Sequence, residues 1–312
     1  MGSEQSVPSS SSSPPPPPLS YVYEDRFTNT NTQSSNPGSE WKKLSSVQTF
    51  ALPKTVVQGD NQPLSSPDAV RFCAISDTHG LHDKPVSVIK DELPVADVLL
   101  HAGDFTDKGT RKDLEKFLDF LEECSKHFEE VIFIAGNHDI TLDTVFYEKE
   151  WSRFHKMRVD AVETKEWFLG QIRERCPNVH YLEDQVHVTV GGVVVYGSPW
   201  QPTFHKWAFN LDRGKPCLSA WEKIPTNTDV LLTHGPPLGR GDKCHPFGVR
   251  AGCLDLLHQI QNRIKPKVHV FGHIHEGFGS SSDGTTDYIN ASTCNFAYRP
   301  TNSPVIFDIE KK

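Results

Sequence analysis

The chain has 312 residues, of which 36% are hydrophobic, so it can bury a sizeable core. Its formal net charge of -8 and pI of about 6.0 argue against strong nucleic-acid binding and against broad binding to anionic membranes. No run of 18 apolar residues and no apolar signal region is present, so we expect a cytoplasmic protein without a membrane span. The seven cysteines include no Cys-x-x-Cys pair and are expected to be reduced thiols.

Residues 1–67 differ in composition from the rest of the chain. They contain ten of the 23 prolines, with a serine run at 9–13 and a proline run at 14–18. Such a segment buries too little apolar surface to fold alone, so we predict a disordered Ser/Pro-rich tail. The proline run is either a solvated spacer or a ligand for a partner that recognises proline motifs, and aromatic residues such as Trp41 could dock part of the tail on the domain.

The first six residues fit a myristoylation pattern, with Gly2 after the initiator and a serine at position 6. No early cysteine and no polybasic cluster follows them. One acyl chain gives only weak, reversible membrane binding. We therefore favour an unmodified start, with weak membrane association as the consequence if Gly2 is acylated.

From residue 68 onward, short β-branched runs alternate with charged amphipathic stretches, which indicates one α/β domain over 68–312. Apolar residues recur at helical spacing in the longest amphipathic stretch, 111–128. Further helices are predicted at 162–175 and 253–263. Strands are predicted at 70–75, 97–101, 131–135, 186–190, 193–196, 230–233, 268–271 and 305–309.

Five short blocks of metal-ligating residue types follow these strands. In Asp77-Thr78-His79, residues two apart point the same way in extended backbone, so a carboxylate and an imidazole can reach one cation. In the second block, Gly103 lets the chain turn sharply, and the Asp104 carboxylate has two oxygens with which to bridge two metals. The other blocks are Gly136-Asn137-His138-Asp139, Thr233-His234-Gly235-Pro236-Pro237 and Gly272-His273-Ile274-His275.

Each block alone is weak, because a lone Asp-x-His or surface histidine is usually structural. Together the blocks supply only oxygen and nitrogen donors, which suits Mn, Fe or Zn rather than Ca or a thiolate zinc site. Since every block stands at a predicted strand end, we predict that they form one metal centre.

The ordered blocks resemble the calcineurin-like metallophosphoesterase superfamily. The segments 75–79, 196–200, 233–237 and 288–294 are similar to the metallophosphoesterase-domain-containing phosphodiesterases of animals. The resemblance covers residues 68–312. It implies a fold of the α/β (α+β) class, a four-layer β-sandwich flanked by helices on both faces.

The resemblance also implies a site with two divalent metal ions, with Mn expected first and Fe or Zn as alternatives. His138 would be a catalytic residue, and Asp139 would orient it. Some close relatives lack the histidine at the position of His273, and its presence here favours a full second metal site. One metal would be held by Asp77, His79, Asp104 and His275, and the other by Asp104, Asn137, His234 and His273.

The implied function is a dinuclear metal-dependent phosphodiesterase that hydrolyses cyclic nucleotides or related small phosphodiesters. Two cations lower the pKa of a bridging water, which supplies hydroxide, and neutralise charge on the phosphoryl oxygens. His138 would assist the leaving group. The resembled Ser/Thr protein phosphatases carry an arginine where this chain has Lys108. An ammonium cannot bind phosphate as a bidentate guanidinium does, so we rank a protein phosphatase lower.

Two other functions remain alternatives. A nucleotide-binding or partner-binding regulatory or scaffold protein with low turnover would not need the complete ligand set. A nuclease would share the metals but needs a basic track that the sequence lacks. One segment bears on the substrate, since its aromatic residues form either a stacking wall for a nucleobase or part of the core: Trp200, Phe204, Trp207 and Phe209.

Overall fold

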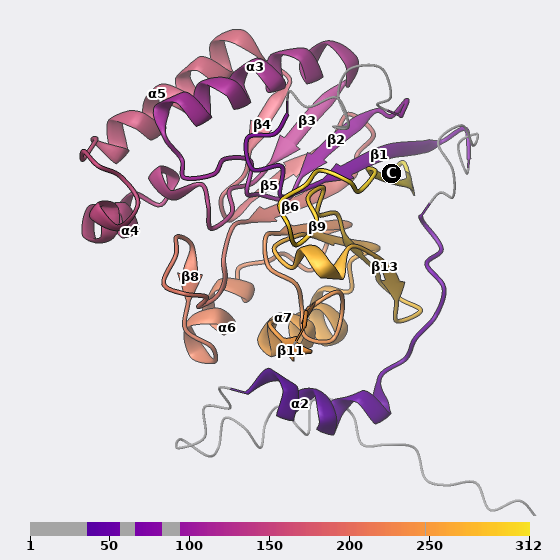
Figure 1. The fold of residues 1–312 in the computed structure, drawn as a ribbon. Coiled ribbons are helices and arrows are strands. Elements are labelled where there is room, and N and C mark those ends of the chain that lie inside the picture. Colours follow the sequence, from indigo (N-terminus) through magenta and orange to yellow (C-terminus); the bar gives the residue numbers. More distant parts are fainter. Residues whose placement is uncertain (1–35, 57–65, 83–93, 247) are drawn as a thin grey trace, which may run out of the picture.

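The computed structural model describes residues 36–56, 66–82, 94–246 and 248–312. Gly2 and the proline run at 14–18 lie outside these residues, so the predictions made for them remain predictions. Two β-sheets pack face to face and carry helices on their outer faces (Figure 1).

The first sheet has the strand order β15-β1-β2-β3-β4, in which β1 to β4 are parallel and β15 is antiparallel to β1. Because the parallel strands run the same way, their carboxyl ends lie at one edge of the sheet. The strand bounds are β1 Ala69–Ile75, β2 Val98–His101, β3 Glu130–Phe133, β4 Val179–Tyr181 and β15 Val305–Glu310.

The second sheet has the order β13-β14-β12-β9-β6-β5, with four parallel central strands between antiparallel edge strands. Two short pairs lie outside the sheets: β7 Gln201–Pro202 with β8 Asn210–Leu211, and β10 Lys243–Cys244 with β11 Val249–Arg250. The bounds of the sheet are β5 Gln185–Val188, β6 Val194–Ser198, β9 Val230–Thr233, β12 Val268–Phe271, β13 Gly279–Ser282 and β14 Asp287–Asn290.

Strand β1 shows why four layers form. Phe72 and Ala74 face the second sheet, whereas Cys73 and Ile75 face the helices, and all four are fully buried. A strand that is covered on both faces must be apolar on both faces, so its sequence is a continuous hydrophobic run.

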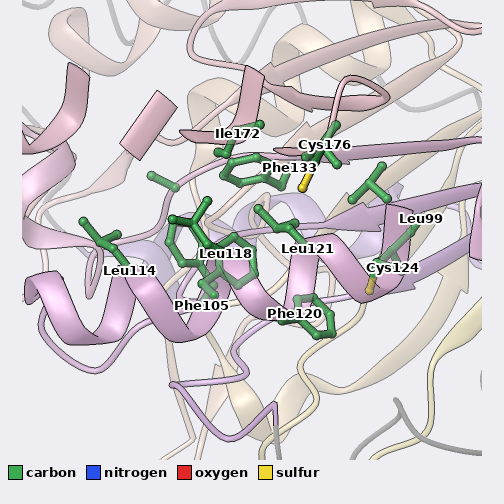
Figure 2. Close-up of a cluster of buried hydrophobic side chains, with 14 of the residues drawn as sticks. Leu99, Phe105, Leu114, Leu118, Phe120, Leu121, Cys124, Phe133, Ile172 and Cys176 are labelled. Atoms are coloured by element: carbon green, nitrogen blue, oxygen red, sulfur yellow. The ribbon is translucent and has the colours of Figure 1, made fainter. Parts of the chain in front are cut away.

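Two helices cover the first sheet: α3 Arg111–His127 and α5 Ala161–Arg175. Figure 2 shows leucines of α3 packed with Phe133 of β3 and Ile172 of α5. The second sheet is covered by α6 Lys215–Trp221 and α7 Leu254–Gln259 (Figure 1). The predicted four-layer architecture is confirmed.

Each predicted strand and helix is present, with ends shifted by up to two residues. The helix predicted at 253–263 is α7 followed by a π-helical turn, Ile260–Ile264. Strands β4, β13 and β14 of the two sheets were not predicted as strands, and neither were the two-residue strands β7, β8, β10 and β11. The first has three residues and β13 consists of glycine and serine, so neither has the β-branched run that marks a strand. Helices α4 Thr144–Glu150 and α6 were also not predicted, nor were several 3-10 turns, among them Trp151–Arg153 and His275–Gly277.

Part of the predicted tail is folded, which corrects the boundary at residue 67. Helix α2, Pro37–Leu44, buries Leu44 against Leu238 and Leu257. Farther along, Ala51 pairs with Ser282 of β13 and Val56 with Phe307 of β15, so the segment spans the edges of both sheets. The domain supplies the apolar surface that this segment lacks by itself.

All seven cysteines are free thiols. Among the described residues, the structure contains no helix with the length and hydropathy that a membrane span requires.

Candidate metal centre

The predicted ligands come together at the carboxyl ends of the parallel strands of both sheets. Asp77 follows β1, Asp104 follows β2, and Asn137 and His138 follow β3. From the second sheet, His234 follows β9, and His273 and His275 follow β12. Backbone pairing between Ser76 and Ser292 joins the two sheets here.

Asp77, His79 and His275 form one group of potential ligands, with one ligand atom from each lying within 4.8 Å of the others. The Nε2 atom of His275 lies 3.4 Å from Asp77 Oδ1 and 3.2 Å from His79 Nε2. All three side chains are buried. This arrangement matches the ligand set expected for one metal, apart from Asp104.

Asp104, His234 and His273 form a second group under the same distance limit. The Nε2 atom of His234 lies 3.3 Å from Asp104 Oδ2 and 3.2 Å from Asn137 Oδ1. Asp104 also belongs to a third group, with His79 and His138. Asp104 therefore connects the two predicted metal sites, as a bridging carboxylate would.

Four predicted ligands have left-handed backbone conformations, with φ of 52° at Asp77, 45° at His79, 54° at Asp104 and 67° at His273. Such conformations are disfavoured for residues with a side chain, and they occur mostly where a functional site requires them. The strand ends are therefore bent to direct these side chains to a common centre.

Two glycines of the motifs let the ligand carboxylates lie directly against the backbone. A Cβ atom at Gly136 would lie 2.3 Å from Asp104 Oδ1, and one at Gly272 would lie 2.0 Å from Asp77 Oδ2. Neither distance is compatible with a side chain, so the motif glycines are required by the ligands that pass beside them.

Backbone carbonyls orient two of the histidines. His234 Nδ1 lies 2.8 Å from the carbonyl of Ala102, and His275 Nδ1 lies 3.0 Å from that of Asn295. When Nδ1 donates to a carbonyl, Nε2 is left as the metal-binding nitrogen. Ser292 Oγ similarly donates to Asp77 Oδ2 at 2.9 Å. The sequence did not predict these contacts, because every residue has a carbonyl and serine is common.

The electrostatics of the centre suit cations. Burial raises the pKa of Asp77, but the hydrogen bond to His275 and the charges of His275 and His234 together outweigh burial and hold this pKa below its usual range. Burial lowers the pKa of His79 and of His273 to about 3, so both imidazoles are neutral at pH 7. Ionised carboxylates beside neutral imidazoles are the protonation states in which these groups bind metals. The donor set therefore fits two divalent ions.

His138 lies beside this centre, with its ring centroid 4.6 Å from that of His79 and 4.2 Å from that of Trp207. Its Nδ1 contacts the backbone carbonyl of Asp107 at 2.8 Å. The Asp139 carboxylate instead accepts hydrogen bonds from the N–H groups of Asp104 and Gly136 and from Thr106. The expected orientation of His138 by Asp139 is thus corrected. The Asp139 carboxylate faces the backbone of the turn at Asp104, and the Asp107 carbonyl contacts the His138 ring.

The four aromatic residues between 200 and 209 were expected either to form a stacking wall or to belong to the core, and the structure shows both cases. Phe209 lies in the hydrophobic core, and the partly buried Trp200 packs against this core. Phe204, by contrast, is 41% exposed, with its ring centroid 5.3 Å from that of His273. Trp207 lies against His138, with the two rings tilted by 33°, and lines a cleft of about 650 Å³ beside α4 together with Trp200 and Phe209. Two of the four residues therefore belong to the site.

Tyr298 was not predicted, although it lies against the same centre. Its ring centroid is 4.7 Å from that of His79 and 5.1 Å from that of His275, and its φ is 56°. Burial raises the pKa of its hydroxyl to about 12, and the Asp104 and Asp77 carboxylates add to this effect. Tyr298 follows the 288–294 segment, whose likeness to known phosphodiesterases was the available signal.

Comparisons with known proteins agree with this geometry. Residues 70–277 match the family model of the calcineurin-like phosphoesterases. The chain is 40% identical over 279 residues to human metallophosphoesterase domain-containing protein 1, covering 88% of this chain and 83% of that protein. A UPF0046 protein of Caenorhabditis elegans is 42% identical over 249 residues, which is 78% of this chain and 61% of that protein.

One solved crystal structure is similar in fold, with a TM-score of 0.51 at 17% identity over 73% of this chain and 92% of its own. The matched family model covers most of the domain and contains every predicted ligand. The chain therefore belongs to the calcineurin-like phosphoesterase family, and it is a metallophosphoesterase that hydrolyses phosphoric esters.

Proposed function

We propose that this protein is a dinuclear metal-dependent phosphodiesterase that hydrolyses small phosphodiesters, with cyclic nucleotides as the substrate class. The observation that carries the proposal is the pair of ligand groups joined at Asp104. A protein that only binds a nucleotide would not need two ligand groups with His138 beside them.

The first metal would be held by Asp77, His79, Asp104 and His275, and the second by Asp104, Asn137, His234 and His273. Oxygen and imidazole donors without thiolate favour Mn, with Fe or Zn as alternatives. When bound, such ions lower the pKa of a water ligand and neutralise charge on phosphoryl oxygens.

His138 is proposed as the group that assists the leaving oxygen. The Asp107 carbonyl can only accept a hydrogen bond, so its 2.8 Å contact places a hydrogen on His138 Nδ1. The opposite nitrogen, Nε2, is then available to the reacting ester. A protonated ring can donate from Nε2 to the departing oxygen, which in general-acid catalysis contributes about 10² to 10⁴ in rate.

Aromatic side chains support a substrate with a planar ring. Phe204, Trp207 and Tyr298 each contact a histidine of the centre, and Phe204 and Tyr298 are 41% and 49% exposed. Exposed rings beside a catalytic centre can stack on a nucleobase. Lys108, which is half exposed, provides a positive charge but no bidentate phosphate contact, and this favours a diester over a phosphoprotein.

The test is hydrolysis of bis-p-nitrophenyl and mono-p-nitrophenyl phosphate, together with 2′,3′- and 3′,5′-cyclic nucleotides. Chelator-stripped protein is reconstituted with Mn²⁺, and wild type is compared with His138→Ala. We expect metal-dependent cleavage of diesters and a kcat about 10² to 10⁴ lower in the variant at unchanged metal content. Absence of turnover by wild type with both metals bound would favour a nucleotide-binding regulatory protein instead.

A further inference from the structure

The loop of residues 203–209, called here the aromatic loop, has an unfavourable backbone. His205, Lys206 and Phe209 have left-handed φ values of 48°, 55° and 52°, and none of them is glycine. Residues 203–206 are exposed, so core packing does not hold this part of the loop. A strained, exposed loop keeps one conformation only when its neighbours fix it.

The aromatic loop nevertheless carries the two rings that face the metal centre. The Trp207 ring lies 4.2 Å from that of His138 at a tilt of 33°, and Phe204 meets the ring of His273 edge to face, at 89°. Tyr298, which belongs to a different segment, lies against His79 and His275. The position of the loop backbone therefore decides where a planar group can stack beside the metals.

Arg153 is the side chain that spans the strained part of the loop. Its Nη1 donates to the carbonyl of Lys206 at 2.6 Å and its Nη2 to the carbonyl of His205 at 3.1 Å. Glu150 accepts a further bond from Nη1 at 3.0 Å and so fixes the guanidinium from α4. A planar guanidinium can bind two adjacent carbonyls at once, which a lysine ammonium cannot do with the same geometry.

The neighbours of Arg153 complete this support. Phe154 lies against Trp207, with centroids 4.9 Å apart, and the Arg153 guanidinium lies 5.0 Å from the Phe154 ring. The Asp143 carboxylate, which caps α4, also accepts a hydrogen bond from the N–H of Phe209 at 2.8 Å. The segment 143–154 thus holds the loop at its middle and at its end.

We propose that Arg153 is a positioning residue that fixes the aromatic loop as one wall of the substrate site, so that Trp207 and Phe204 hold the planar ring of a nucleotide-type diester. This inference rests on the proposed phosphodiesterase function and adds a specificity determinant outside the metal centre. Arg153 acts through the loop and has no part in bond cleavage.

The test compares two diesters with the same leaving group in Mn²⁺-reconstituted protein. One is the p-nitrophenyl ester of thymidine 5′-phosphate, which has a base, and the other is methyl p-nitrophenyl phosphate, which has none. We expect Arg153→Lys to raise KM for the thymidine ester about fivefold or more, since loss of one stacking contact has at least this effect. Both kcat and KM for the methyl ester should stay within about twofold of wild type, because the same bond is cleaved and this ester has no base to contact the aromatic loop.

Two controls separate positioning from general damage. Arg158 is another arginine that pairs with α4, through Glu148, and it is not among the residues that bind the loop carbonyls. The control Arg158→Lys should therefore leave kcat and KM for both esters unchanged. In a double-mutant cycle, Arg153→Lys should add little to Trp207→Leu, because both changes remove the same stacking contact. Equal effects on the two esters, or fully additive effects in the cycle, would overturn the inference.

The outcomes also distinguish this inference from the proposed function. Absence of turnover by wild type would contradict the phosphodiesterase, whereas turnover that Arg153→Lys leaves unchanged would contradict only the inference. Calorimetric binding of thymidine 5′-phosphate tests the loop independently of turnover. We expect the Arg153→Lys and Trp207→Leu proteins each to bind it about fivefold or more weakly than wild type, and unchanged binding would again overturn the inference.

Discussion

The carboxylate of Asp139 accepts a hydrogen bond from the backbone N–H of Asp104 at 3.0 Å. His138 N–H in turn donates to Asp104 Oδ1 at 2.7 Å, so the turn after β2 and the turn after β3 hold each other. The central carboxylate of the metal site is therefore positioned by the residue pair that follows Asn137.

The first prediction concerns Asp139→Asn. Asp139 faces only donors, and an amide would turn its NH₂ group towards two of them. We expect the unfolding free energy to fall by about 1 to 3 kcal/mol and metal content to fall with it, as measured by urea unfolding and elemental analysis. Asp160→Asn, at the N-cap of α5, is the control for a lost carboxylate at a distant turn. Full metal content with a low kcat would instead restore the expected role of Asp139 in orienting His138.

The second prediction concerns Ser292→Ala, which removes the donor to Asp77 Oδ2. Loss of a hydrogen bond to a metal ligand typically weakens affinity about tenfold or more. We expect one of the two Mn²⁺ ions to bind that much more weakly, because Asp77 belongs to one ligand group. Titration calorimetry of wild type, Ser292→Ala and the exposed control Ser280→Ala measures this. Equal weakening of both ions would contradict the assignment of Asp77 to a single site.

The third prediction concerns pH. In the metal-free protein, burial lowers the pKa of His234, but Asp104, with smaller contributions from Asp77 and the Ala102 carbonyl, outweighs burial and raises this pKa to about 9. The stability that the His234–Asp104 pair contributes is fully present below pH 6.5, the pKa of histidine in the unfolded chain, and is lost as pH rises through about 9. The Tm of chelator-treated protein should therefore fall over this range, and Mn²⁺ affinity should rise, since binding expels the proton. A Tm that is constant from pH 6.5 to 9, or an Mn²⁺ affinity that does not change, would contradict this ion pair.

The fourth prediction concerns Trp41→Ala in helix α2. The indole packs where a Cβ on Gly239 would be, only 1.8 Å from Trp41 Cζ3, and the Arg250 guanidinium lies 4.5 Å from its ring. We expect urea unfolding to show a loss of about 2 kcal/mol, which is below the usual cost for a fully buried tryptophan because Trp41 is partly exposed. The kcat should be unchanged. Leu52→Ala, at an 86% exposed position of the same segment, should have little effect. Equal stability of the two variants would show that α2 is not part of the folded domain.

Local signals explain which parts of the fold could be predicted. Strand β1 is apolar on both faces and is followed at once by Asp77 and His79, so both strand and ligands can be read from neighbouring residues. Strand β13, Gly279 to Ser282, has no such signal and is held by pairing with β14. Helix α2 was assigned to the tail because its stability comes from Leu238 and Leu257, which are distant in sequence.

The sequence by itself determined the composition of the metal centre, because each ligand block contains its own residue types at a strand end. Only the tertiary structure decided the contacts of those ligands, including the carbonyls of Ala102, Asn295 and Asp107 that meet His234, His275 and His138. It also separated Trp200, which packs against the core, from Trp207, which lies beside His138. The physical reason is that a carbonyl occurs in every residue and an aromatic ring suits core and binding wall alike, so only their place in space distinguishes them.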